Sequence, residues 1–233
     1  MLPTSLRKLT GLLFITGAIL VNIPYTLLIM NFDYPDILRQ PIGDILTQFQ
    51  AGGSALIYTW LAFAWVGLPI LVGILLLPKI MPDTPLLKVA TTAGVIASLT
   101  QIAGLLRWVF VVPILAQTYT DPTTSAATKD AVVIAFQVIH QYGGVVMGEH
   151  LGQLFTIFWM MLVSVAMFKS DLFKPWLGWF GIIASAVYAL AQTELLATVL
   201  PTFPVIPNTG LYGSLLWLAW MLILGLTLLF RRS

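Results

Sequence analysis

Six long apolar runs constrain what this chain can fold into. A helix that crosses a bilayer needs about 20 consecutive apolar residues, and six runs of roughly that length or longer lie near Leu9–Met30, Ala51–Leu77, Ala90–Leu115, Met147–Phe168, Trp176–Val199 and Leu211–Phe230. The segments between them are too short to hold a soluble domain. The runs therefore predict an all-α polytopic membrane bundle of about six transmembrane helices, with residues 1–233 forming a single transmembrane domain.

The composition agrees with this class and excludes several others. Charged residues make up 9% of the chain and hydrophobic residues 59%, whereas a soluble domain carries roughly a quarter charged residues. The chain has no cysteine, which excludes disulfides, thiolate metal sites and cysteine nucleophiles. A net charge of +2 is too small and too dispersed to indicate a nucleic-acid partner. The predicted partner is the lipid bilayer.

The basic residues fall mainly on one side of a six-span arrangement. Lysine and arginine gather on the cytoplasmic side of membrane proteins, and eight of them share one side here: Arg7, Lys8, Lys79, Lys88, Lys169, Lys174, Arg231 and Arg232. Arg39 and Lys129 fall on the other side. This bias predicts cytoplasmic N- and C-termini. The first run is too long for a signal-peptide core, so we interpret it as an uncleaved span.

The segment before the fourth span is longer than a membrane requires. Lys129–Phe168 contains roughly 38 apolar-rich residues, which would reach about 57 Å as one helix and exceed the hydrocarbon thickness nearly twofold. The pair Gly143–Gly144 is a natural place for a break. We therefore expect Asp130–Tyr142 to form an extra helix on the outer side, before the fourth span.

A few ionisable residues fall inside the spans. Such residues are costly in a bilayer and usually face the bundle interior. In the predicted topology Arg107, Glu149, His150 and Glu194 all lie toward the outer half, and Gln153 lies beside them. Their shared depth predicts an outward-facing polar pocket that binds or transports a small molecule or a lipid. Within it, Arg107 is expected to pair with Glu149 or Glu194.

Two alternatives use some of the same residues. The charged groups would also serve a purely structural role if they only lock helices together, as in a subunit of a larger complex. A membrane enzyme or redox protein would use His150, with His140, as haem ligands. The sequence specifies no cofactor and no catalytic residue. For a metal site His140 and His150 are only a weak candidate pair, because on one continuous helix they would lie about 15 Å apart along the axis.

Three glycines recur at every fourth position in the fourth run, at Gly144, Gly148 and Gly152. Small residues at this spacing let a neighbouring backbone approach closely. We expect this face to pack against another helix, either within the chain or in a homo-oligomer.

Two local stretches are distinctive. One is Asn31-Phe32-Asp33-Tyr34-Pro35-Asp36-Ile37-Leu38-Arg39 in the first outer loop, and the other is Gly148-Glu149-His150-Leu151-Gly152. After the first, Pro41 suits the start of a short helix with an apolar face. Together the two stretches resemble the bacterial membrane family known as domain of unknown function 4386. The resemblance implies a small polytopic protein of the bacterial cytoplasmic membrane. It supplies no activity and no catalytic residue.

Overall fold

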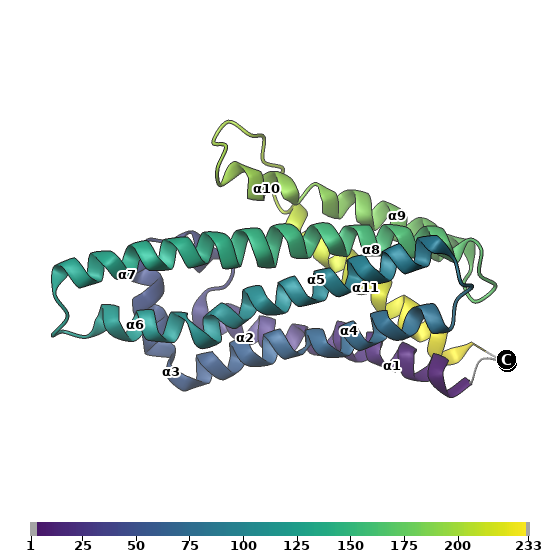
Figure 1. Cartoon of the computed structure of the whole chain (residues 1–233), viewed down its shortest axis with the longest axis horizontal. Helices are drawn as coiled ribbons and strands as arrows, with labels where there is room; N and C mark the ends of the chain where they lie inside the picture. The colour runs from purple at the N-terminus through teal and green to yellow at the C-terminus, as the bar shows by residue number, and fades with distance from the viewer. Residues whose placement is uncertain (1–3, 232–233) are drawn as a thin grey trace. The chain divides into compact units, whose positions relative to one another are not determined.

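The computed structural model describes residues 4–231, and within that range the regular structure is helical (Figure 1). Arg232, one of the eight basic residues counted above, lies outside the described residues. Six helical stretches are long and apolar enough to cross a membrane: Thr4–Phe32, Ile42–Lys79, Pro85–Thr120, Ala126–Met167, Pro175–Ala197 and Thr209–Phe230. They confirm the all-α class and the predicted number of spans.

Three of these stretches are interrupted close to a proline. The breaks separate α1 (Thr4–Leu20) from α2 (Asn22–Phe32), α3 (Ile42–Trp65) from α4 (Gly67–Leu76), and α5 (Pro85–Phe110) from α6 (Val112–Thr120). Proline has no N–H and clashes with the carbonyl four residues earlier. Pro24, Pro69 and Pro113 lie two or three residues after the interrupted positions, Val21, Val66 and Val111.

The prediction of a break at Gly143–Gly144 is wrong. The helical stretch Ala126–Met167 is continuous over 42 residues, and it contains α7 (Ala126–Ile139), the π-helix η3 (His140–Leu151) and α8 (Gly152–Met167). The glycine pair lies inside η3, so the chain changes its winding there instead of turning. The expected extra helix exists as α7. Its first turn is capped by the Ser125 hydroxyl, which accepts a hydrogen bond from the Thr128 N–H.

The loop after α2 is followed by a short helix, as predicted. A 3-10 helix, η1 (Asp36–Arg39), precedes Pro41, and α3 begins at the next residue. Within α3, Gly53 adopts φ 54° and ψ −151°, a combination that only glycine adopts readily. The residues from Ile42 to Gly53 therefore form a short helix bent away from the rest of α3.

The described chain divides into two compact units. Unit 1 comprises residues 4–19, Gly67–Thr100 and residues 150–231, including α8, α9 (Pro175–Ala189), α10 (Gln192–Ala197) and α11 (Thr209–Phe230). In this unit α9 packs against both α8 and α11 (Figure 1). Trp159 and Trp220 are buried in its core with their rings 5.5 Å apart.

Unit 2 comprises Leu20–Val66 and Gln101–Glu149. Here α3 packs against α2, α6 and α7, and α6 and α7 pack against each other. The short helix at the start of α3 contributes Ile45, Leu46 and Phe49 to the core of this unit, as its predicted apolar face requires. The same core contains a dense group of aromatic rings, one of which, Trp108, lies beside the buried Arg107.

Candidate functional site

The central charged residue of unit 2 is Arg107, whose exposed fraction is 7%. Its guanidinium donates a hydrogen bond to the carbonyl of Gly104 in its own helix. Within unit 2 it makes no ion pair with a described carboxylate. Glu149 acts on Arg107 electrostatically, and its carboxylate also lies 3.8 Å from Arg39, so the pairing of Arg107 with Glu149 or Glu194 stays a prediction. A guanidinium buried without a carboxylate is costly, so its surroundings are informative.

A cluster of aromatic rings packs next to this guanidinium. The Arg107 Cζ lies 5.1 Å from the centre of the Trp108 ring, within the range of a cation–π interaction. Trp108 in turn stacks on Trp60, with ring centres 4.8 Å apart and planes 9° apart. Phe32 and Phe49 also contact Trp108, at 5.4 and 5.6 Å between ring centres. Both tryptophans are fully buried.

His140 is another neighbour of Trp108. Its ring stacks on Phe136, with centres 5.3 Å apart and planes 14° apart, and lies 6.2 Å from the Trp108 ring. Both ring nitrogens are buried. One faces the backbone of Leu38, but neither makes a hydrogen bond of normal geometry. A buried imidazole therefore has one N–H and one acceptor nitrogen available.

Five buried nitrogen atoms of this region have no hydrogen-bond partner. They are the Nε of Arg107, the Nε1 atoms of Trp60 and Trp108, and both ring nitrogens of His140. Buried polar groups in proteins are almost always hydrogen-bonded, to protein, to ordered water or to a ligand. Four of these five atoms are N–H donors in the neutral form of the imidazole. The region therefore has more buried hydrogen-bond donors than nearby hydrogen-bond acceptors.

The remaining charges of the site are Arg39 and Glu149. Arg39 Nη2 lies 3.8 Å from Glu149 Oε2, and the side chains are 43% and 25% exposed. Glu149 also acts on Arg107 through space, and Arg39 acts on His140. Arg39, Arg107 and Glu149 thus lie in the same region as the unpaired donors.

Close backbone packing holds this region together. A Cβ built on Gly144 would lie 2.7 Å from Arg107 Nη2 and 2.9 Å from its Cζ, and one built on Gly104 would lie 2.6 Å from the Cα of Gly148. The glycine face predicted to pack is thus filled at Gly144 and Gly148 by residues of the same chain. Any side chain at Gly144 would displace the guanidinium.

The other predicted site residues belong to unit 1 and form a separate polar group. His150 Nδ1 lies 2.6 Å from Gln192 Oε1, and Gln192 Nε2 donates to Gln153 Oε1 at 3.0 Å. These three side chains are partly buried, whereas Glu194, two residues after Gln192, is exposed. Among residues 4–231, no three His, Cys, Asp or Glu side chains gather in a way that would hold a metal ion.

The match to known families covers almost the whole chain. Residues 9–225 match the family model described as a domain of unknown function, DUF4386. This chain belongs to the DUF4386 family. No curated protein and no solved structure matched this DUF4386 chain in the corresponding comparisons. Residue roles in this DUF4386 member must therefore be argued from its own geometry.

In this DUF4386 member Arg107 and Glu149 are predictable from the sequence as intramembrane charges, but their aromatic neighbours are not. Trp60 and Trp108 are easily taken for membrane-interface anchors, the usual role of tryptophan in a span. Their positions well inside the second and third apolar runs were the one available signal. Arg39 was assigned only to the outer loop, and nothing in the sequence links it to Glu149.

Proposed function

We propose that this DUF4386 protein binds a small anionic molecule, a carboxylate or a phosphate, at the buried donors of unit 2. The observation that carries the proposal is the set of unpaired nitrogens at Arg107, Trp60, Trp108 and His140. An anion would supply acceptors for several of them at once. Hydrogen bonds from charged donors such as a guanidinium are the strong ones.

The energetic argument follows from the number of donors. Leaving one buried donor without an acceptor costs about 1–3 kcal/mol. Four such donors in one aromatic region would remove a large part of the 5–15 kcal/mol by which a typical protein is stable. A bound acceptor offsets this cost, and the buried Arg107 guanidinium favours an anion over a neutral molecule.

The depth of the site supports access from the outer side. Arg107 follows Lys88 by 19 residues, and Glu149 precedes Lys169 by 20. At 1.5 Å per residue, these separations correspond to about 28–30 Å of helix, which is about the thickness of the hydrocarbon layer. With Lys88 and Lys169 at the basic, cytoplasmic end, Arg107 and Glu149 lie near the outer edge of that layer. We infer that the ligand enters from the extracytoplasmic side.

The polar group of unit 1 is a secondary part of the proposal. His150, Gln153 and Glu194 are proposed to form a second polar surface of the protein, with Gln192 orienting the imidazole. No contact between this group and the unit 2 site is assumed. The two groups are therefore tested by separate substitutions.

The primary test is native mass spectrometry of gently solubilised protein, followed by thermal shifts with inorganic phosphate and with mono- and dicarboxylates. We expect a retained anion or a stabilising probe whose effect is lost in Arg107→Leu. In Glu149→Gln, the same probe should bind more tightly, because a competing negative charge is removed. Opposite effects of these two substitutions would be hard to explain by general damage to the fold.

His140→Phe and Trp60→Phe complete the test. Each removes unpaired nitrogens, so the ligand-free protein should melt at the same or a higher temperature while probe binding weakens. Val138→Leu, at an exposed position of α7, is the control and should change neither. If no variant alters any probe and no mass is retained, the donors are satisfied by water and the proposal fails. A retained haem with a Soret band would favour the redox alternative instead.

A further inference from the structure

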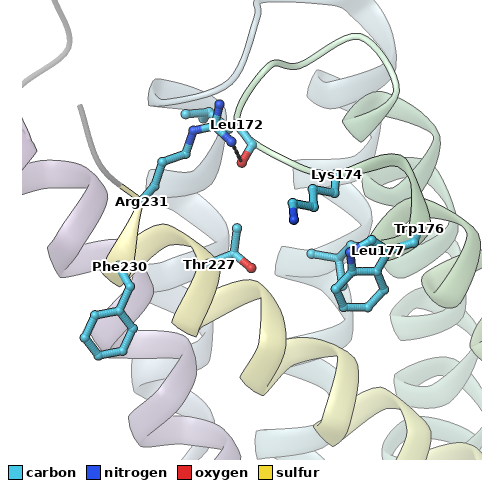
Figure 2. A pocket seen from close by; sticks show the side chains of 7 residues that line it. All are labelled: Leu172, Lys174, Trp176, Leu177, Thr227, Phe230 and Arg231. Atoms are coloured by element: carbon cyan, nitrogen blue, oxygen red, sulfur yellow. Dashed lines mark hydrogen bonds between the residues drawn. The ribbon is translucent and has the colours of Figure 1, made fainter.

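The basic end of unit 1 contains a hollow that the proposed function does not use. It has a volume of about 340 Å³ and lies where α9 begins and α11 ends (Figure 2). Its lining combines two cationic side chains, Lys174 and Arg231, with Trp176, Leu177 and Thr227. A volume of this size is at the lower end of the range for small-molecule sites.

The two cations of this hollow differ in how they are held. Arg231 Nη1 donates to the carbonyl of Leu172 at 2.8 Å, and the Arg231 carbonyl accepts from Arg7 Nη2 at 2.6 Å. Arg231 is thus tied to the rim, while the Lys174 ammonium points into the hollow (Figure 2). Among the described residues, no acidic side chain lines the hollow. Asp171, on the same loop, is exposed outside the lining.

The polar and apolar parts of the lining have a definite arrangement. The Thr227 hydroxyl donates to the carbonyl of Ile223 at 2.8 Å, so its oxygen still has an acceptor site for a ligand hydroxyl. Leu177 is buried, and the exposed rings of Trp176 and Phe230, 52% and 72% accessible, flank the hollow. Exposed tryptophan beside lysine and arginine is typical of the membrane–water interface.

We infer that this hollow binds the headgroup of an anionic phospholipid, with phosphatidylglycerol as the fitting class. Lys174 and Arg231 would hold the phosphate, the Thr227 oxygen would accept a hydrogen bond from a glycerol hydroxyl, and Trp176 and Phe230 would contact the acyl chains. Anionic lipids attract basic groups at the cytoplasmic surface. The hollow lies at the basic end of unit 1, which is the proposed cytoplasmic end. A soluble ion would gain nothing from the exposed aromatic flanks.

The test uses the full chain in a mild neutral detergent. Phosphatidylglycerol, phosphatidylethanolamine and inorganic phosphate are titrated separately, and bound lipid is counted by native mass spectrometry. We expect phosphatidylglycerol to bind and the other two to bind much more weakly. Lys174→Gln should weaken phosphatidylglycerol binding about fivefold, the effect of removing roughly 1 kcal/mol per basic residue. Lys174→Arg should restore it.

Lys79→Gln is the matched control, since it removes the same charge from an exposed position at the basic end outside the hollow. Its binding should equal that of the unmodified protein. The inference is overturned if Lys79→Gln weakens binding as much as Lys174→Gln, which would indicate diffuse surface charge. It is also overturned if phosphate competes as well as the lipid, or if Lys174→Gln has no effect. Arg107→Leu should leave this lipid binding intact, which separates it from the unit 2 site.

Discussion

Gly104 and Gly148 bring two helices of unit 2 into backbone contact, and the contact is asymmetric. A Cβ on Gly104 would lie 2.6 Å from the Cα of Gly148, whereas a Cβ on Gly148 would find its nearest neighbour at 3.4 Å. The first distance requires the backbone to move, and the second is an ordinary van der Waals contact. The two glycines therefore have different roles although both face the same junction.

This asymmetry predicts different stabilities for two alanine variants. Gly104→Ala should destabilise the protein by about 1–3 kcal/mol, the usual cost of overpacking. Gly148→Ala should be close to neutral. Unfolding in a denaturing detergent, followed by circular dichroism, measures both. Equal losses for the two variants would mean that the close approach of Gly104 to Gly148 does not exist.

The bend in α3 gives a prediction based on backbone conformation alone. A Cβ on Gly53 would meet nothing within 4 Å, yet its φ of 54° and ψ of −151° disfavour every residue that has a Cβ. Gly53→Ala should cost about 1–3 kcal/mol. Gly210→Ala, also at an uncrowded position but within α11, should not destabilise the protein. A neutral Gly53→Ala would indicate a straight α3.

The turn between α6 and α7 should depend on acid pH. The Thr123 hydroxyl and backbone N–H donate to Asp121 Oδ1 at 2.7 and 2.8 Å, and these bonds lower the pKa of the Asp121 carboxyl below its usual value. Because the folded pKa is depressed, the stabilisation is present above the unfolded pKa, near 3.9, and is lost as pH falls through the folded value.

Carboxyl-detected NMR of Asp121 measures this effect directly. In Thr123→Ala the carboxyl should titrate at a higher pH than in the unmodified protein. Thr124→Ala changes a neighbouring threonine whose N–H bonds the Asp121 carbonyl, not its carboxylate, and should leave the titration where it was. A Thr123→Ala titration that does not move would exclude the hydrogen-bonded turn.

The polar group of unit 1 depends on Gln192. This amide bonds His150 on one side and Gln153 on the other, so Gln192→Leu leaves two partly buried side chains without their partner. We expect a loss of about 1–2 kcal/mol, together with a changed NMR line shape of the His150 imidazole as its orientation becomes free. Gln137→Leu, an exposed glutamine of α7, is the control. An unchanged imidazole signal in Gln192→Leu would contradict the link.

The proposed orientation is testable because the chain has no cysteine. Pro82→Cys and Pro122→Cys introduce single thiols at exposed positions of two different loops. In intact cells, a membrane-impermeant maleimide should label the thiol of the Pro122→Cys variant. It should label the thiol of the Pro82→Cys variant only after the membrane is permeabilised. The reverse result would invert the topology and would turn the unit 2 site toward the cytoplasm.

The sequence predicted some of this architecture and could not have predicted the rest. The six spans and the short helix after Pro41 follow from hydropathy and from proline chemistry, both of which are local properties. The π-helix of His140–Leu151 does not, because apolar periodicity indicates a helix without fixing its winding; Gly143–Gly144 reads equally well as a break. Tertiary packing usually decides such cases.

The candidate site was predictable in the same partial way. The cost of burying a charge identifies Arg107 and Glu149 from sequence, but it does not determine their partners. Arg39 forms an ion pair with Glu149, and Arg107 lies against Trp108 and Gly144. The Arg39–Glu149 and Arg107–Gly144 contacts join residues distant in the chain, so no pattern within one run reveals them. The same holds for the stacking of Trp60 on Trp108.

That stacked pair makes unit 2 optically distinct. Two indole rings that lie nearly parallel at 4.8 Å couple their electronic transitions strongly, whereas Trp159 and Trp220 of unit 1 meet almost at right angles, with planes 84° apart. The far-ultraviolet circular dichroism of the protein should therefore contain an indole couplet that disappears in Trp60→Phe. Such a band reports the assembly of one unit separately from the other, without any added label.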